Sequence, residues 1–354
     1  MSTEESLSPG QSKTVTASSV VIRVESGESA LKSAGRRLLV VMLTASILMN
    51  VMFIISSAAN SLTDTGSGVR RQFHSGTRAA ADKLAIIRFS GTITPPFTER
   101  WLKQIKEATD DDDVKGVLLA VDSPGGLVAD SHQLYHELQK LREKKPIYVA
   151  MKRLAASGGY YIAMGIGPRG KIFAEPTTWT GSIGVIIPRY NAQELASKVG
   201  VTSEPLATGP LKDTLSPFRD LTQQERDVWE DILQDSFERF VNVIADNRSS
   251  LNGDQVRELA TGQIYTTSQA LKNGLVDDVG YEEDALAALA SELGLEEYEA
   301  VEYSSPQTLL DVLLSGKAKT PRGLLDDVLD ASTPKALYYC SWNPWIPATA
   351  RSQL

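Results

Sequence analysis

Ser157 is the residue whose surroundings best suit nucleophilic chemistry. It lies in the run Leu-Ala-Ala-Ser-Gly-Gly-Tyr-Tyr, between an apolar stretch typical of a strand and the start of a predicted helix. A serine at such a turn stands at the positive end of the helix, where free backbone N–H groups point at the group that it attacks. An isolated Ser-Gly-Gly is more often a helix N-cap, so the assignment depends on the residues that accompany it.

The base that activates this serine is expected to be a lysine, because the chain has only three histidines. Lys212 is the best candidate, since it lies in Gly-Pro-Leu-Lys-Asp with apolar residues on both sides. A lysine accepts a proton only when it is neutral, and burial among apolar groups lowers its pKa from ~10.4. The next residue, Asp213, opposes that shift if its carboxylate points the same way, and the sequence leaves its direction open.

Acyl transfer also requires donors for the oxyanion that develops on the attacked carbonyl. Two positions offer backbone N–H groups that no side chain obstructs: Gly158, directly after the serine, and the pair Gly125-Gly126 in Asp-Ser-Pro-Gly-Gly. The pair follows an apolar strand and precedes a helix, so we expect it at the carboxyl edge of a sheet, where α/β folds build their sites. Nucleophile, base and donors together indicate an acyl-transfer enzyme.

The elements that position these residues alternate between strand and helix. Strands are predicted at 83–94, 114–121, 147–151, 171–174 and 182–187, and helices around Trp101, Ile105 and Ala108 and over 128–142. Such alternation predicts an α/β fold with a mainly parallel sheet and flanking helices. The longest helix is predicted from Thr222 to Asn247, with a capping box between Thr222 and Glu225 and a wide apolar face.

A membrane anchor is predicted near the N-terminus. Residues 38–57 carry no charge, over the ~20 residues that a helix needs to cross ~30 Å of hydrocarbon. Lys32, Arg36 and Arg37 precede this stretch, which predicts a cytoplasmic N-terminus and an extracytoplasmic location for residues after 58. A cleaved signal peptide is the competing interpretation, because Ser-Ala-Ala at 57–59 is a small-residue site, but the leader would be unusually long.

We therefore predict five segments. They are a disordered cytoplasmic tail (1–37), a transmembrane anchor (38–58), a linker (59–82), a peptidase domain (83–320) and a C-terminal tail (321–354). The tail contains Tyr338, Tyr339, Trp342 and Trp345 among prolines, too aromatic for a linker and too irregular for a domain. It is expected to pack on a neighbouring subunit, to lie in a peptide groove or to be a flexible terminus.

Composition argues against several other classes of protein. A net charge of −8 without a basic, aromatic-rich cluster disfavours nucleic-acid binding, and the single cysteine, Cys340, excludes a disulfide framework and zinc-finger spacing. His132 and His136 are four residues apart on a predicted helix, but no third ligand accompanies them, so we interpret them as a surface or interface pair. We expect no metal and no cofactor.

Four motifs in order resemble those of the signal peptide peptidase A family. They are Asp-Ser-Pro-Gly-Gly (122–126), Ala-Ala-Ser-Gly-Gly-Tyr-Tyr-Ile-Ala (155–163), Thr-Gly-Ser-Ile-Gly-Val (180–185) and Leu-Lys-Asp (211–213) followed by Ser-Pro-Phe-Arg (216–219). The resemblance covers about 83–293 and implies a serine protease with a Ser/Lys dyad and a ClpP-like fold. Leu127 stands where members of the family often have a third glycine, which would narrow the substrate groove.

By this resemblance Ser157 is the nucleophile and Lys212 the general base, Gly126 and Gly158 supply the oxyanion N–H groups, and Ser182 hydrogen-bonds the lysine. It further implies a membrane-anchored, ring- or bowl-shaped homo-oligomer whose substrates are remnant signal peptides and other small peptides. Two alternatives stay open: a catalytically silent ring that scaffolds other membrane proteins, and a crotonase-like acyl-thioester enzyme. The second would need acidic catalysts and a coenzyme A site, and no sequence feature demands either.

Overall fold

The structure of this 354-residue chain is a computed structural model that describes residues 37, 39–52, 68–305 and 337–339. These residues belong to two units, Met1–Thr65 and Gly66–Leu354. In the first unit, residues 39–52 form a helix with exposed side chains. Within the described ranges, no helix is long and apolar enough to cross a membrane. The predicted anchor also includes residues 38 and 53–58, which lie outside those ranges.

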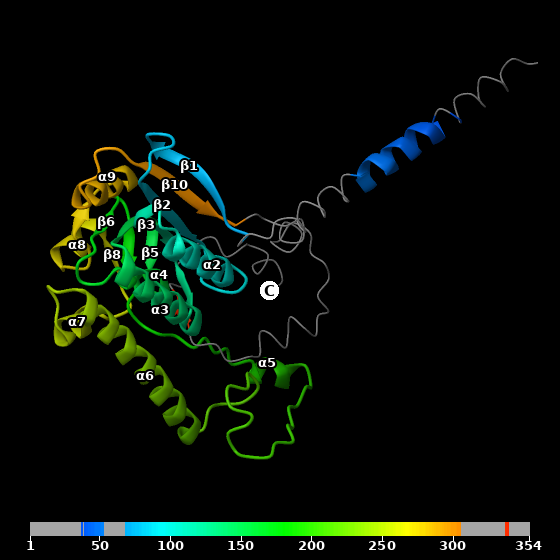
Figure 1. The fold of residues 1–354 in the computed structure, drawn as a ribbon. Helices are drawn as coiled ribbons and strands as arrows, with labels where there is room; N and C mark the ends of the chain where they lie inside the picture. Colours follow the sequence, from blue (N-terminus) through cyan, green and yellow to red (C-terminus); the bar gives the residue numbers. More distant parts are fainter. Residues whose placement is uncertain (1–36, 38, 53–67, 306–336, 340–354) are drawn as a thin grey trace, which may run out of the picture. The chain divides into compact units, whose positions relative to one another are not determined.

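A mainly parallel sheet forms the centre of the second unit (Figure 1). Over its described residues the strand order is β1-β10-β2-β3-β5-β6-β9, and β7 pairs with both β5 and β8. Neighbouring strands are parallel except for the β1–β10 and β7–β8 pairs. The strands are β1 (Arg70–Gly76), β2 (Lys83–Ser90), β3 (Val114–Ser123), β5 (Ile147–Ala156), β6 (Ile172–Ala174), β7 (Trp179–Gly181), β8 (Ile264–Thr266), β9 (Asp278–Val279) and β10 (Glu299–Ser304).

Helices cover both faces of this sheet. The helices are α2 (Phe97–Asp110), α3 (Val128–Lys144), α4 (Gly158–Ala163), α5 (Gln193–Lys198), α6 (Gln223–Asn247), α7 (Gly253–Leu259), α8 (Thr267–Lys272) and α9 (Glu282–Glu292). Successive strand residues point to opposite faces. Leu119 and Val121 of β3 therefore pack into the larger core with α2, α3, α4 and the end of α6, while Leu118 and Ala120 pack into a second core with α9.

Several sequence predictions are confirmed. Trp101, Ile105 and Ala108 are buried along α2, and the capping box between Thr222 and Glu225 begins α6. The strand predicted at 182–187 is absent, because β7 ends at Gly181 and the backbone of Ser182 then adopts a left-handed conformation with φ of +50°. The apolar face of α6 is buried only near its C-terminal end, and Val228 is exposed.

The folded part also begins earlier than the sequence indicates. β1 lies within residues 59–82, for which the sequence predicts a linker, and it pairs with β10 at the edge of the sheet. Its residues are exposed or half-buried, so it lacks the apolar run of a central strand. The predicted boundary at 320 lies outside the described ranges.

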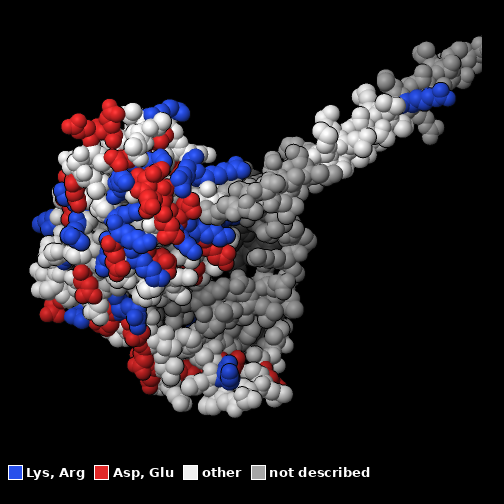
Figure 2. Space-filling view, viewed as in Figure 1, with Lys and Arg blue, Asp and Glu red and all other residues white. Residues whose placement is uncertain are grey.

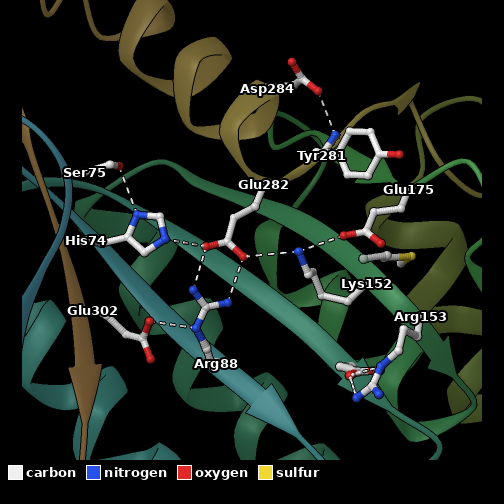
Figure 3. Close-up of polar contacts among 12 residues, drawn as sticks. His74, Ser75, Arg88, Lys152, Arg153, Glu175, Tyr281, Glu282, Asp284 and Glu302 are labelled. Carbon is white, nitrogen blue, oxygen red and sulfur yellow. Dashed lines mark hydrogen bonds and ion pairs between the residues drawn. The ribbon is translucent and has the colours of Figure 1, made fainter.

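A network of ion pairs fixes β1, β10 and α9 to the centre of the sheet (Figure 3). Glu282, the first residue of α9, is buried and receives two hydrogen bonds of 2.8 Å from Arg88 of β2. His74 of β1 and Lys152 of β5 also lie within ion-pair distance of this carboxylate, at 3.3 and 3.6 Å. Burial alone would raise the pKa of Glu282, but the hydrogen bonds and charge of Arg88 hold it below its usual range. We call this group of residues the Glu282 network.

Residues 182–222 join β7 to α6 and carry α5. Figure 1 shows this segment, which we call the arm, extending away from the sheet. Large apolar side chains of the arm are exposed, including Tyr190 and Leu206. In Figure 2 the arm around α5 shows few charged side chains, whereas Lys and Arg alternate with Asp and Glu over the rest of the face drawn. The arm therefore presents an apolar surface to solvent in the single chain.

Candidate active site

Ser157 stands at a strained turn between β5 and α4. It is the N-cap of α4, with φ of +56° and ψ of −116°, a backbone conformation that a non-glycine residue adopts only at a cost. Its side chain is 1% exposed, and none of the described residues gives its hydroxyl oxygen a hydrogen-bond partner. A buried hydroxyl without a partner is destabilising, so this position is built for something other than stability.

Two glycine-bearing segments meet beside this serine. A Cβ on Gly158 would lie 2.7 Å from Ser131 Oγ and 3.1 Å from the backbone nitrogen of Gly126, so only glycine fits there. Gly125 has φ of +94°, and Gly126 is equally crowded, because a Cβ on it would lie 2.1 Å from the carbonyl oxygen of Ile93. The two backbones can approach each other this closely only without side chains, and the N–H groups of Gly126 and Gly158 come together beside Ser157.

A short strand, β4 (Gly125–Leu127), carries one of these segments. Ile93 bonds to one side of it, donating to the Gly125 carbonyl and accepting from the Leu127 N–H, both at 2.9 Å. Successive residues of a strand present their N–H and C=O groups to opposite neighbours, so the groups of Gly126 face the other side. Leu127, which stands in place of a third glycine, is half-buried and does not close this edge.

The C-terminal tail occupies that other side. β11 (Leu337–Tyr339) pairs antiparallel with β4, with Tyr338 opposite Gly126. The carbonyl oxygen of Tyr338 lies 2.0 Å, and the backbone nitrogen of Gly158 2.5 Å, from the point where a Cβ on Gly125 would stand. A peptide carbonyl therefore lies beside the N–H groups for which the sequence predicts an oxyanion role. Residues 337–339 of the predicted tail thus lie against β4 of the same chain.

The side chain of Tyr338 fills an aromatic pocket. It is fully buried, with its ring centroid 4.9 Å from that of Tyr161 and 4.7 Å from that of Phe240. Its hydroxyl donates to the carbonyl of Ser236 at 2.8 Å. The Tyr161 hydroxyl lies 2.7 Å from Nδ1 of His132, so this histidine supports the pocket wall. We call these surroundings the Tyr338 pocket.

In the described part of the single chain, Lys212 makes no hydrogen bond to Ser157. It is exposed on the arm, and over the described residues no hydrogen bond or ion pair involves its amine. Ser182 is nearly buried, and its N–H donates to the carbonyl of Gln263, but no hydrogen bond joins it to Lys212 in the described part of the chain. The burial of Lys212 that its apolar neighbours predict is thus absent from one isolated copy.

The sequence did not single out the residues that shape the Tyr338 pocket. Tyr161 and Phe240 belong to apolar stretches of two predicted helices, where an aromatic residue is ordinarily part of the core. The available signal is the spacing of Tyr161, which follows the nucleophile by one helical turn and so lies on the same side of α4. Nothing in the local sequence marks Phe240 as its partner.

Comparisons with known proteins identify the family of the chain. The family model of peptidase family S49 matches residues 139–296, and that of Clp protease matches residues 71–205. A protein of Enterococcus faecium that carries the name signal peptide peptidase SppA is 40% identical over 254 residues, 68% of this chain and 73% of the relative. Protease 4 of Salmonella typhi is 33% identical over 235 residues, 66% of this chain and 37% of the relative.

Two solved structures are also similar to the chain. A variant of ClpP1 from Listeria monocytogenes shares 15% identity over 57% of this chain and 94% of its own, with a TM-score of 0.39. A variant of the 1510-N membrane-bound stomatin-specific protease shares 19% identity over 60% and 86% of the two chains, with a TM-score of 0.41. From the family matches and the 40% identity to the Enterococcus faecium relative, we conclude that this chain belongs to peptidase family S49, a serine-type peptidase with a ClpP-like α/β fold.

Proposed function

We propose that this chain is a membrane-anchored serine endopeptidase in which Ser157 is the nucleophile and Lys212 the general base. The observation that carries the proposal is the buried, unpartnered hydroxyl of Ser157 at a strained turn, next to a glycine edge on which a peptide strand is already paired. A strained backbone and a buried hydroxyl without a hydrogen-bond partner both cost stability. Proteins retain them at functional sites, here where the hydroxyl is proposed to react.

The chemistry proceeds in two steps. Neutral Lys212 takes the proton from Ser157 Oγ as this oxygen bonds to the substrate carbonyl carbon, and the N–H groups of Gly126 and Gly158 stabilise the oxyanion. The Lys212 ammonium then protonates the leaving amine as the peptide bond breaks, which leaves an acyl-serine. A water molecule, deprotonated by Lys212, attacks the ester carbonyl carbon. As the bond to Ser157 Oγ breaks and the acid product forms, the Lys212 ammonium returns the proton to this oxygen and restores the serine. Ser182 is proposed to orient the lysine amine.

The substrate is an extended peptide that adds a strand to β4. The tail strand β11 is the model for this binding mode, since main-chain pairing supplies affinity and the Tyr338 pocket supplies selectivity. The residue in that pocket would be the one whose carbonyl reaches the Gly126 and Gly158 N–H groups. A large apolar or aromatic residue is therefore expected directly before the cleaved bond.

Assembly of several copies is proposed to complete the site. A solvated lysine is protonated at neutral pH, so Lys212 must lose solvent to act as a base. Apolar side chains around it, such as Leu206 and Phe218, are exposed in the single chain and offer a surface for such a cover. A homo-oligomeric ring that packs the arm against another copy would meet this need.

The sequence and the relatives support a proposed location and a proposed class of substrates. We propose that the uncharged stretch at 38–58 anchors the chain in the cell membrane, with the N-terminus in the cytoplasm and the peptidase outside. The relative from Enterococcus faecium carries the name of a signal peptide peptidase. Remnant signal peptides and other small or membrane-associated peptides, rich in large apolar residues, suit the Tyr338 pocket.

Labelling with a serine-reactive fluorophosphonate probe tests the proposal. The full-length protein in detergent is expected to be labelled at Ser157, as located by mass spectrometry, and to cleave an apolar signal peptide. The Ser157→Ala variant is expected to lose both activities while keeping its fold. A folded, assembled wild-type protein that is not labelled at any pH from 7 to 10 would instead support the silent scaffold.

A further inference from the structure

The loop that carries Lys212 also carries a carboxylate at the next position. A carboxylate close to an amine stabilises the ammonium form. A general base must be neutral when it accepts a proton, so an unpaired Asp213 beside Lys212 would oppose catalysis. The sequence does not show where the Asp213 side chain points, but the contacts of the arm do.

Asp213 is engaged by Arg219. Nε of Arg219 lies 3.0 Å from Oδ2 of Asp213, and Nη2 of the same guanidinium donates to the Asp213 carbonyl at 2.7 Å. The guanidinium also pairs with Glu225, with Nη1 at 2.8 Å from Oε2. The hydrogen bond from Arg219 lowers the pKa of Glu225 to about 2, so Glu225 is ionised together with Arg219 at neutral pH. These groups line an open pocket of about 550 Å³ next to Gly209 and Pro210.

Two further contacts hold the loop in place. Nε1 of Trp229 donates to Oγ1 of Thr214 at 2.7 Å, which ties the loop to α6. Nη2 of Arg189 donates to the carbonyls of Ser216 and Arg219. The side chain of Asp213 is thereby fixed toward Arg219, while the Lys212 amine has no partner among the described residues.

We propose that Arg219 is a positioning residue for the base: it holds the Asp213 carboxylate in place and offsets part of the negative charge around it, so that the neighbouring Lys212 amine can become neutral. This inference rests on the proposed Ser157/Lys212 dyad. Among the described residues no hydrogen bond or ion pair joins Arg219 to Ser157, so its proposed effect on the base passes through Asp213. The charged groups around this loop are Arg189, Asp213, Arg219, Asp220 and Glu225, and Asp220 is bonded to Asn191 on the arm.

The test is the pH profile of kcat/KM for a fluorogenic peptide, measured on the full-length protein in detergent between pH 6 and 10. Arg219→Ala is expected to move the midpoint of the acidic limb up by about one pH unit. Activity should fall roughly tenfold at pH 7 and recover toward pH 10. Adding Asp213→Asn to Arg219→Ala is expected to return the midpoint to the wild-type value, because the uncompensated carboxylate is gone.

Two controls separate charge from structure. Trp229→Phe removes the hydrogen bond to Thr214 without changing a charge, so it is expected to lower activity without moving the midpoint. Arg219→Lys keeps the charge and is expected to keep the wild-type midpoint. If Arg219→Ala does not fold, the midpoint of the Lys variant alone tests whether the charge at position 219 matters. A Lys variant with the midpoint displaced as in the Ala variant would contradict the inference.

Two results distinguish this inference from the proposed function. If Arg219→Ala loses activity equally at every pH and Asp213→Asn does not rescue it, Arg219 is a structural contact and the inference is wrong while the dyad stands. If Lys212→Ala retains wild-type activity, the dyad itself is wrong, whatever Arg219 does.

Discussion

The two halves of the candidate site differ in how far one chain completes them. Around Ser157 the sheet, α4 and β4 leave the nucleophile 1% exposed, with backbones packed too closely for any residue but glycine. Around Lys212 the arm leaves both the amine and its large apolar neighbours in solvent. The difference teaches that folding of one chain is enough to build the surroundings of Ser157, whereas Lys212, if it is the base as proposed, needs a cover that the single chain does not supply.

The largest expected effect comes from the nucleophile half. Ser157→Ala should reduce peptide hydrolysis by on the order of 10⁴-fold or more. The same change removes a buried, unpartnered hydroxyl, so the free energy of unfolding should stay equal or rise by about 1 kcal/mol. Peptide cleavage assays and urea unfolding measure the two quantities. A marked loss of stability would show that the hydroxyl has a structural partner, and the contrast with Lys212 would weaken.

The Glu282 network should account for a large part of the stability on the sheet side. Glu282→Gln leaves Arg88 and Lys152 facing a neutral group, which should cost about 3–5 kcal/mol. Because the folded pKa of Glu282 lies below its ordinary value, its contribution is present above the ordinary carboxylate range and is lost as pH falls. Urea unfolding at pH 7 and pH 4 measures this. The matched control is Glu302→Gln, because Glu302 of β10 also pairs with Arg88, at 2.7 Å, but is more exposed than Glu282.

Pairing of the tail with β4 should have a moderate effect on KM for a peptide substrate. Tyr338→Ala empties the Tyr338 pocket and weakens β11 pairing, so KM for a peptide substrate should fall a few-fold. Tyr338→Phe removes only the hydrogen bond to Ser236 and should change KM less. Steady-state kinetics with one peptide decides. An unchanged KM in both variants would mean that the tail and the substrate occupy different places.

The smallest effect on folding is expected on the arm. Leu206→Ser should change the free energy of unfolding of an isolated copy by less than about 0.5 kcal/mol, since the side chain is fully exposed. It should nevertheless weaken assembly, which light scattering in detergent measures. If this substitution destabilises the monomer instead, the arm packs within its own chain and the contrast between the two halves fails.

Much of the sheet could be predicted because its central strands are buried on both faces and read as apolar runs. β1, at the edge of the sheet, and β10, which lies between β1 and β2, escaped prediction, since neither has the long apolar run of a central strand. The strand predicted at 182–187 failed for a different reason: its residues are apolar, but the left-handed backbone at Ser182 turns the chain away from β5.

Some residues of the candidate site could likewise be predicted from the sequence, and others could not. Ser157, Gly126 and Gly158 lie together as their motifs indicate, because each motif marks a local turn. The apolar residues around Lys212 predict a buried amine, but Lys212 and the apolar side chains Leu206 and Phe218 of the arm are exposed in the single chain. A pattern of residues cannot specify whether the same chain or another copy covers such a surface. The Tyr338 pocket could not be predicted either, as it joins α4, α6 and the tail, which are far apart in sequence.

The rate at which a fluorophosphonate probe labels Ser157, measured from pH 7 to 10 in the assembled wild-type protein and in Lys212→Ala, tests the central claim most directly. We predict that the wild-type rate rises with pH as the amine becomes neutral, and that the variant is labelled at least about 100-fold more slowly throughout. Equal rates in the two proteins would contradict the account, because Ser157 would then be activated without Lys212.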